Sequence, residues 1–212
     1  ATNFDGNDTF IGTSNADTIN AGGGADTISG NGGADVINAG AGADVIRLTQ
    51  AQLAQAAAIN GGTDADIDTI LITEPSATIT DANFAIVTGI ERLQLTGANT
   101  LVLGSTAAAA GIGTIVLGNG DTSITLNDGV TMTIDAAALP DGNTLTIAGS
   151  GNFTINNLVG DLISTAASGT VALTLNGSGA TVVNSSITNN GAATSFTVNQ
   201  GTFDGADTIN LL

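Results

Sequence analysis

Large apolar residues recur at every ninth position in the first 47 residues, at Phe10, Ile19, Ile28, Ile37 and Ile46. An aspartate stands two positions before each of them, at Asp8, Asp17, Asp26, Asp35 and Asp44. Glycine or asparagine stands two positions before each aspartate, and these residue types accept the positive φ of a tight turn. Each nonapeptide is therefore predicted to form a six-residue turn followed by a three-residue strand.

Two nonapeptides together are predicted to form one coil of 18 residues. Successive coils would stack through parallel strands about 4.8 Å apart, with the apolar column inside. Stacking places Asp8, Asp26 and Asp44 in one row and Asp17 and Asp35 in the opposite row. Carboxylates one strand spacing apart repel by about 1–4 kcal/mol per pair, so we expect a cation between them. Carboxylates and turn carbonyls are hard oxygen ligands in the number that Ca²⁺ prefers, and they suit Mg²⁺ less well. The alternative is a metal-free array of Gly/Asp turns.

These nonapeptides resemble the calcium-binding RTX repeat, G-G-x-G-x-D-x-U-x, over residues 3–47. The resemblance implies a parallel β-roll with about three complete sites, in which each Ca²⁺ is bound by two main-chain carbonyls and one aspartate from each of two turns. The first site would use Phe4, Gly6 and Asp8 with Ala21, Gly23 and Asp26. The second would use Thr13, Asn15 and Asp17 with Gly30, Gly32 and Asp35, and the third Gly22, Gly24 and Asp26 with Ala39, Ala41 and Asp44.

The regular repeats end near residue 48, and residues 49–59 are rich in Ala and Gln. This composition predicts a short helix that has Thr49 as its cap and ends at the Asn-Gly-Gly of residues 60–62. We expect this helix to cover the roll or to connect it to the next layer.

An acidic segment follows within residues 62–70 and resembles a repeat. Its aspartates, Asp64, Asp66 and Asp68, are candidate additional metal ligands. They would close the half-sites that the roll leaves open above Asp35 and Asp44. The alternative interpretation is a solvated acidic turn.

Short apolar–polar–apolar triplets recur from residue 70 onward, at residues 93–95, 101–103, 115–117, 124–126, 132–134, 145–147, 153–155, 173–175 and 196–198. Interruptions at 106–111, 136–142 and 161–169 predict loops or one-turn helices. We therefore expect an all-β fold, in which a parallel β-roll of RTX nonapeptides continues into a β-solenoid-like stack of short strands with one or two short helices. The predicted segments are 1–48 for the roll, 49–61 for the connection and 62–212 for the Thr/Gly-rich solenoid, with a β-sandwich as the alternative.

The end of the chain repeats its beginning, because residues 202–209 follow the pattern of residues 3–10. Both ends of a solenoid expose unpaired strand edges and half-built ion sites. We expect the ends to stack, between successive modules or between separate molecules, with Ca²⁺ shared through Asp207 and Asp8. Asp204 and Asp207 are therefore further candidate ligands. The alternative is a coincidental turn motif.

Charge and residue content narrow the possible functions. The 212 residues include 19 Asp and Glu but only two cations, Arg47 and Arg92, which gives a formal net charge of −17. Nucleic acids and anionic membrane surfaces need basic residues, and no run of 18 apolar residues is present, so we expect no nucleic-acid partner and no membrane insertion. The chain has no Cys, His or Lys for nucleophilic catalysis, and we expect no enzyme. The catalytic alternative is a carboxylate pair among Asp64, Asp66, Asp68 and Glu74.

The expected function is that of a calcium-dependent extracellular structural protein or module, of the S-layer, matrix-fibre or adhesin type. It would fold and assemble end to end on binding Ca²⁺, with itself or cell-surface components as partners. The resemblance implies type I secretion to the bacterial surface without an N-terminal signal peptide. Residues 89–97 are similar to segments of RTX surface and S-layer proteins, with Glu91 and Arg92 as a structural pair. The alternatives are a calcium-dependent folding and secretion domain of an RTX enzyme and an ice-binding face of Thr133, Thr146, Thr154 and Thr174.

Overall fold

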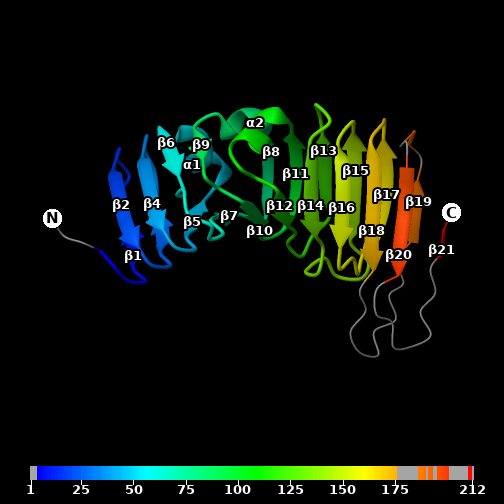
Figure 1. The fold of residues 1–212 in the computed structure, drawn as a ribbon, viewed down its shortest axis with the longest axis horizontal. Helices are drawn as coiled ribbons and strands as arrows, with labels where there is room; N and C mark the ends of the chain where they lie inside the picture. The colour runs from blue at the N-terminus through cyan, green and yellow to red at the C-terminus, as the bar shows by residue number, and fades with distance from the viewer. Residues whose placement is uncertain (1–3, 176–185, 190, 193–194, 201–209, 212) are drawn as a thin grey trace.

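Parallel strands stacked along one axis make up the computed structural model, which describes residues 4–175, 186–189, 191–192, 195–200 and 210–211. The stack is elongated and arched, with the N-terminal coils at one end and the C-terminal strands at the other (Figure 1). Every strand pair in the described residues is parallel, as expected for a solenoid rather than a β-sandwich. The predicted all-β, parallel β-solenoid fold with one or two short helices is confirmed, and the described residues contain two α-helices.

The longest of three sheets runs from the first repeat to the far end of the stack. Its ten strands are, in spatial order, β1 (Thr9–Ile11), β3 (Thr27–Ser29), β5 (Val45–Leu48), β7 (Thr69–Ile72), β10 (Arg92–Leu95), β12 (Thr114–Val116), β14 (Thr131–Asp135), β16 (Asn152–Asn156), β18 (Thr170–Leu175) and β20 (Ser195–Gln200). This sheet continues without a break from the predicted roll into the predicted solenoid, while residues 49–61 contain α1 and a strand of another sheet. The segment boundaries themselves stay a prediction.

The other strands form two shorter sheets. The four-stranded sheet consists of β2 (Thr18–Gly23), β4 (Val36–Ala41), β6 (Ala58–Asn60) and β9 (Val87–Thr88). The seven-stranded sheet consists of β8 (Ser76–Thr80), β11 (Ala98–Leu103), β13 (Thr122–Leu126), β15 (Thr144–Gly149), β17 (Asp161–Ala166), β19 (Ser186–Asn189) and β21 (Asn210–Leu211). One coil contributes both β8 and β9, so the change of sheet takes place there.

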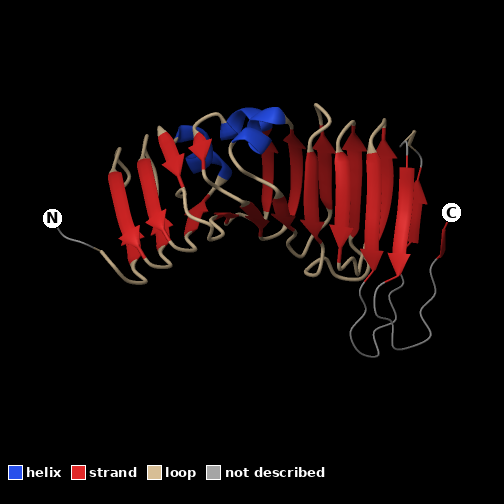
Figure 2. Cartoon of the chain, in the orientation of Figure 1, coloured by secondary structure: helices blue, strands red, loops and turns tan. Residues whose placement is uncertain are grey.

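The helical turns gather in the middle of the stack, where the shorter sheets change over (Figure 2). They are α1 (Gln50–Gln55), the 3-10 turn η1 (Asp81–Phe84) and α2 (Ser105–Ala109). Thr49 caps α1 as predicted, in a capping box with Gln52. None of the helices in the described residues reaches the length or apolarity of a membrane-spanning segment.

Asp81 fixes α2 from the preceding coil. Its carboxylate accepts hydrogen bonds from the N–H groups of Gly104 at 2.7 Å, Ala107 at 2.8 Å and Thr106 at 3.1 Å. Burial raises the pKa of Asp81, but the hydrogen bonds from the Thr106 side chain and from these N–H groups outweigh it and hold the pKa below its ordinary value. The charged carboxylate therefore anchors the helix that widens this coil.

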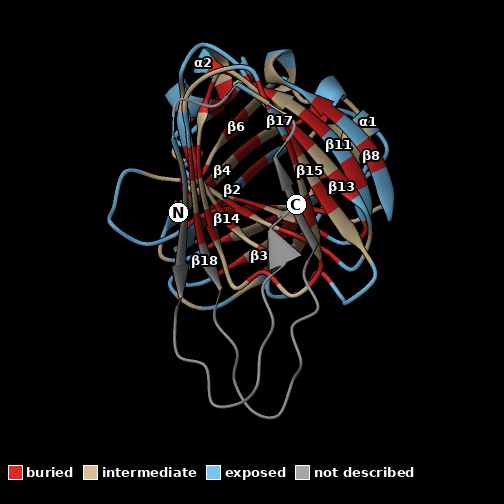
Figure 3. Ribbon diagram, turned by 90° about the vertical axis from the view of Figure 1, so that its right-hand side faces the viewer, coloured by how far each residue is buried: buried red, intermediate tan, exposed pale blue. Residues whose placement is uncertain are grey.

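A continuous apolar column fills the interior behind the ten-stranded sheet, and Figure 3 shows that the buried residues lie mainly in the strands and the exposed residues mainly in the outer loops. From the repeats onward, its fully buried members follow the strand register at Ile28, Ile46, Ile70, Leu93, Ile115, Ile134, Ile155 and Leu173. Each such side chain contributes roughly 1.5–3 kcal/mol through burial. The nonapeptide column and the triplet columns are thus one core.

Two predictions of local structure are wrong, and one alternative does not fit the sheets. The first helix ends at Gln55 rather than near residue 60, because Ile59 is 1% exposed and continues the apolar column in β6. The region 161–169, expected to be a loop or helical turn, contains β17, whose inward residues Leu162, Ser164 and Ala166 are fully buried. The four threonines of the ice-binding alternative are divided between two sheets, since Thr146 lies in the seven-stranded sheet and the other three in the ten-stranded sheet.

Close stacking of the turns predicts that alanine at Gly40 destabilises the protein. Gly40 has φ +119°, and a Cβ there would meet the carbonyl oxygen of Gly22 in the coil below. We expect Gly40→Ala to lower the free energy of unfolding by about 1–3 kcal/mol or more, measured by urea unfolding in Ca²⁺. The matched control is Gly32→Ala, whose Cβ would have no neighbour closer than 3.9 Å. Equal losses in both variants would contradict this account of the turns.

Candidate metal centre

A row of hydrogen bonds links the acidic residues that precede the strands of the ten-stranded sheet. The N–H of Asp8 donates to Asp26 Oδ1 at 2.8 Å, that of Asp26 to Asp44 Oδ1 at 2.7 Å, and that of Asp44 to Asp68 Oδ1 at 2.9 Å. The N–H of Asp68 in turn donates to Glu91 Oε2 at 2.9 Å. Each carboxylate is therefore held against the coil before it, and the row extends two coils beyond the nonapeptides.

The opposite row is short. The N–H of Asp17 donates to Asp35 Oδ1 at 2.9 Å, and Asp17 Oδ2 accepts from the N–H and the hydroxyl of Thr13 at 2.6 and 2.9 Å. In the next coil, the residues that follow α1 lie beside Asp35. The N–H groups of Ala57 and Ala58 donate hydrogen bonds to the main-chain oxygen of Asp35. No carboxylate of the acidic segment follows there, so the prediction that this segment closes the half-site above Asp35 is wrong.

Two carboxylate oxygens in the long row are buried without a partner. Asp26 and Asp44 are each 1% exposed, and their Oδ2 atoms make no hydrogen bond although the atoms are buried. A buried charged oxygen without a compensating contact is costly. A cation in the gap between the turns would supply the missing contact to both, so these residues fit a bound metal ion.

The row carries uncompensated negative charge. Burial raises the pKa of Asp44, opposed by the hydrogen bond from the Asp26 N–H, and the charges of Asp26 and Asp64 raise it further. Burial likewise raises the pKa of Asp68 to about 6, opposed by the N–H of Asp44 and increased by the charges of Asp44, Glu91 and Asp64. A divalent ion would relieve this repulsion.

Main-chain carbonyls line the gaps between the stacked turns. Three glycines lie directly against carbonyl oxygens of the preceding coil, so that an added Cβ would clash with them. The contacts are Gly22 with the oxygen of Phe4, Gly24 with the oxygen of Gly6, and Gly42 with the oxygen of Gly24. Some carbonyls of the predicted sites already accept one hydrogen bond from the neighbouring coil, as in the donor–acceptor pairs Gly23–Phe4, Gly32–Thr13, Gly6–Gly23 and Gly24–Ala41. A carbonyl oxygen has two lone pairs, so each can also accept a cation.

The paired turns of all three predicted sites lie against each other. In the first site, Asp5 and Gly23 form an isolated β-bridge, and the N–H of Asp8 donates a hydrogen bond to the Asp26 carboxylate. In the second, the turn of residues 13–17 lies against that of residues 30–35 through the Asp17–Asp35 bond. In the third, β2 and β4 pair Gly22 with Gly40 and Gly23 with Ala41. The ligand assignment, including Asn15, Ala21, Gly30 and Ala39, stays a prediction.

The acidic segment divides into one buried and two exposed aspartates. Asp68 is 2% exposed and belongs to the long row next to Asp44, and its predicted role in closing the half-site above Asp44 stays a prediction. Asp64 is exposed, and its Oδ2 accepts the Gly42 N–H at 3.1 Å. Asp66 is exposed and contributes its N–H to Asp64 Oδ1 at 2.9 Å. The candidates Asp204 and Asp207 lie outside the described residues.

Glu91 was missed as a member of the row. It stands two positions before the inward-facing Leu93, as each repeat aspartate stands two positions before its isoleucine, and this spacing was the available signal. In the described part of the chain, no three Asp, Glu, His or Cys side chains gather closely enough to hold a metal by themselves. A metal ion in the roll therefore depends on main-chain carbonyls together with the aspartates.

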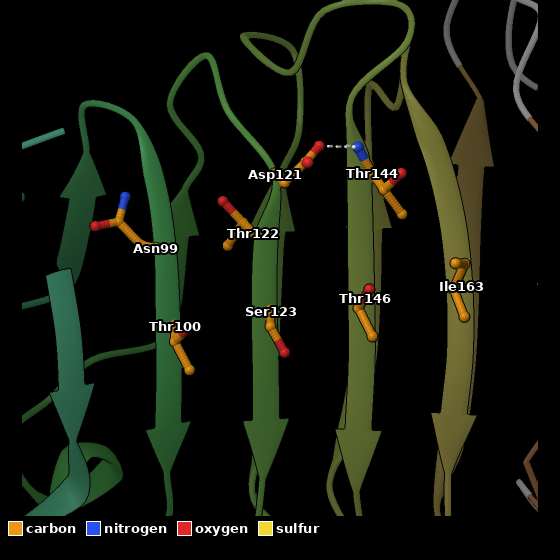
Figure 4. Close-up of a pocket in the computed structure, with 8 residues that line it drawn as sticks. All are labelled: Asn99, Thr100, Asp121, Thr122, Ser123, Thr144, Thr146 and Ile163. Atoms are coloured by element: carbon orange, nitrogen blue, oxygen red, sulfur yellow. Dashed lines mark hydrogen bonds between the residues drawn. The ribbon is translucent and has the colours of Figure 1, made fainter. Parts of the chain in front are cut away.

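A groove of about 330 Å³ lies on the outer face of the seven-stranded sheet, lined by Asn99, Thr100, Asp121, Thr122, Ser123, Thr144, Thr146 and Ile163 (Figure 4). Asp121 Oδ1 accepts the Thr144 N–H at 2.8 Å and the Asn143 amide at 3.1 Å. The lining has no aromatic side chain and one carboxylate, which is already hydrogen-bonded. The lining of the groove therefore contains neither a carboxylate pair nor a cluster of metal ligands.

Comparison with known families agrees with the geometry of the roll. The family model for the RTX calcium-binding nonapeptide repeat (4 copies) matches residues 2–37 and residues 11–46. The N-terminal coils are thus RTX calcium-binding nonapeptide repeats, which implies Ca²⁺ binding, and such repeats are typical of extracellular proteins exported by type I secretion. No curated protein and no solved structure matches the chain.

The raised pKa of Asp68 predicts that acid orders the calcium-free protein. Folding stability from a carboxyl whose folded pKa is raised is fully present below its unfolded pKa, near 3.8, and is lost as pH rises through about 6. Chelated protein should therefore gain strand signal in far-UV circular dichroism when the pH falls from about 7 to about 4.

The neutral variant Asp68→Asn should show more strand at neutral pH and a smaller gain in acid. Asp121→Asn removes the same charge from an exposed site, where the Thr144 N–H and the Asn143 amide lower the pKa. Titration of Asp121 affects stability only below about pH 4. The Asp121→Asn variant should therefore show the same change of strand signal with pH as the wild type above about pH 4. Equal slopes in all three proteins would contradict the role of Asp68.

Proposed function

We propose that this chain is a calcium-dependent extracellular structural module, of the S-layer, matrix-fibre or adhesin type, in which Ca²⁺ bound by the N-terminal repeats orders the whole solenoid. The observation that carries the proposal is the ten-stranded sheet shared by the repeats and the rest of the stack. The last repeat strand, β5, pairs with β7 in register at four positions, from Val45 with Thr69 to Leu48 with Ile72. Order in the roll therefore provides the template for the next coil.

Charge couples this template to calcium. The net charge of −17 and the rows of stacked carboxylates oppose compaction in the absence of a cation. Each Ca²⁺ adds two positive charges where that repulsion is strongest. Since the site does not exist in the unfolded chain, the free energy of calcium binding becomes free energy of folding. The module would be loose where Ca²⁺ is scarce and rigid in the calcium-rich extracellular space.

A structural role also suits the surface. The chain lacks Cys, His and Lys, and the groove on the seven-stranded sheet is lined by hydroxyl and amide groups without a catalytic pair. The solenoid coils beyond the repeats make up most of the chain, more than a tail for calcium-dependent secretion requires. We therefore favour the structural module over the folding and secretion domain of an RTX enzyme.

The N-terminal end of the stack is suited to contact a second copy. There, β1 and β2 are the outermost strands of their sheets. Ile11 in β1 is 73% exposed and Phe4 is 40% exposed, so apolar surface accompanies the open strand edges. End-to-end stacking of copies would cover this surface and complete the half-site at Asp8.

Two single-tryptophan variants test whether calcium orders the whole chain. The sequence has no Trp or Tyr, so Phe10→Trp in β1 reports only on the roll and Phe153→Trp in β16 only on a distant coil. Both positions face the interior, where Phe10 is partly buried and Phe153 is 1% exposed. We expect both fluorescence transitions at the same calcium concentration, together with a coil-to-strand change in circular dichroism.

The variant Asp26→Asn, which weakens the centre of the roll, should shift both transitions to higher Ca²⁺, because Asp26 belongs to two predicted sites. A transition in the Phe10→Trp protein alone, with the indole of the Phe153→Trp protein already buried in the chelated state, would contradict coupling. It would favour a roll that acts only as a separate secretion element.

Stacking predicts particle growth on addition of Ca²⁺, measured by light scattering at high protein concentration. Ile11→Thr should reduce this growth because it removes the apolar residue from the exposed edge. Ile67→Thr is the matched control, since Ile67 is 45% exposed but lies in the acidic loop just before β7, three strands away from β1 in the ten-stranded sheet. A wild-type protein that stays monomeric in millimolar Ca²⁺ would show that copies do not stack.

A further inference from the structure

The groove on the seven-stranded sheet contains a row of side chains that runs across the strands, along the axis of the stack. Thr100 pairs with Ser123, Ser123 with Thr146, and Thr146 with Ile163, so one residue from each of β11, β13, β15 and β17 stands in this row (Figure 4). Adjacent strands of a sheet lie about 4.8 Å apart. The row therefore presents one side chain at each strand spacing, which suits an extended ligand that lies along the stack.

The protein does not use the hydroxyl groups of this row. Thr100 is exposed, Ser123 and Thr146 are half-buried, and none of the three hydroxyls forms a hydrogen bond with another described residue. By contrast, the hydroxyl of Thr165 in the same sheet donates to the carbonyl of Ile147. A free hydroxyl can both donate and accept a hydrogen bond. Three such groups in a row are thus available to a ligand that has donors and acceptors of its own.

Asp121 adds a charged acceptor beside the row (Figure 4). Its Oδ1 accepts the Thr144 N–H and the Asn143 amide, whereas its Oδ2 accepts no hydrogen bond from the described residues. The hydrogen bond from the Thr144 N–H, followed by that from the Asn143 side chain, lowers the pKa of Asp121. The carboxylate is therefore charged at neutral pH, and its free Oδ2 attracts a hydroxyl donor and repels an anion.

Buried side chains hold part of the groove in a fixed shape. Asn99 is 3% exposed, and its amide accepts the Ala77 N–H at 3.0 Å and donates to the carbonyl of Gly97 at 2.6 Å. Thr122 is 2% exposed, and its hydroxyl donates to the carbonyl of Gly120 at 3.1 Å. Both residues line the groove. Because main-chain contacts already fix them, they need not reorganise when a ligand binds, and this lowers the cost of binding.

Charge and hydrogen-bonding chemistry define the class of ligand. None of the residues that line the groove is cationic, and the chain has a net charge of −17, so an anionic ligand would be repelled. The free hydroxyls and the Asp121 oxygen match a ligand with many hydroxyl groups. The side chain of Ile163 and the methyl groups of the threonines match a ligand that also has C–H surface. A neutral carbohydrate combines these two properties.

We propose that this groove binds a neutral, extended glycan, whose hydroxyl groups bond to Thr100, Ser123, Thr146 and Asp121 while its C–H surface contacts Ile163. This inference rests on the proposed function and deepens it, because it gives the structural module an uncharged carbohydrate as partner. The lining has no aromatic side chain to stack on a sugar ring, so a single groove binds weakly. Copies joined in an assembly would bind one glycan through several grooves and so gain avidity.

The test uses cellohexaose, an unbranched neutral oligosaccharide, titrated into the isotope-labelled full chain in millimolar Ca²⁺ and followed by NMR. We expect the amide resonances of Thr100, Ser123 and Thr146 to shift, with a millimolar Kd. Replacing two hydroxyls in the double variant Thr100→Val and Thr146→Val should weaken binding at least about tenfold, because each lost hydrogen bond reduces the affinity. Valine has nearly the shape of threonine and suits a strand, so the sheet should be retained.

The matched control is the double variant Thr133→Val and Thr154→Val. These two half-buried threonines are paired in the ten-stranded sheet, outside the groove, so this variant should bind cellohexaose as the wild type does. A sulfated form of the same oligosaccharide should bind at least about tenfold more weakly, because the negatively charged protein repels it.

The outcomes separate the glycan site from the proposed function. If cellohexaose shifts no resonance of the groove, or if both double variants weaken binding equally, the site is wrong while the calcium-dependent module stands. Equal binding of the sulfated form would contradict the neutral class of ligand. If the wild-type chain shows no calcium-driven ordering in circular dichroism, the proposed function itself fails.

Discussion

The structure depends on one constraint, the stacking of carboxylates at one strand spacing in a parallel sheet. Each acidic residue of the long row accepts the N–H of the one before it, so the row sets the register of the coils while it concentrates negative charge. Hydrogen bonds from the main-chain N–H groups bring the carboxylates close together, and the repulsion between their negative charges opposes this arrangement. At neutral pH, a cation between the turns would allow the fold to satisfy both. Calcium binding is therefore expected to stabilise the stacked coils themselves.

The same geometry explains why coils of different size can share one sheet. Successive members of the row are 18 residues apart within the repeats, then 24 and 23 residues apart once the chain includes α1 and the longer loops. Each coil contacts only its neighbours, so additional residues project outward without disturbing the strand they follow. Asp81 shows how such an insertion is secured, because it reaches across one coil to hold the start of α2. The inward apolar column stays continuous throughout.

Periodicity was sufficient to predict the parts of the fold that repeat. The nine-residue pattern predicted the inward isoleucines and the two aspartate rows, and the apolar triplets marked strands such as β10 and β13. Features that depend on one contact were not predictable in this way. The helix α1 ends early because Ile59 continues the core, and β17 was not predicted because two of its inward residues, Ser164 and Ala166, are small. The roles of Glu91 and Asp64 depend on loop lengths that only the three-dimensional register reveals.

The carboxylates of the long row become more buried from the N-terminal coil toward the solenoid. Asp8, at the open N-terminal edge, is partly exposed, whereas Asp26, Asp44 and Asp68 are at most 2% exposed. Repulsion between carboxylates grows as water is excluded, and the pKa is raised at Asp44 and Asp68, so the charge that most needs a cation lies at the junction with the solenoid and not in the first coil. An ion bound there joins β5 to β7 at the point where the regular repeats stop. Ordering that begins at this junction can extend both ways along the ten-stranded sheet, toward the remaining repeats and into the larger coils.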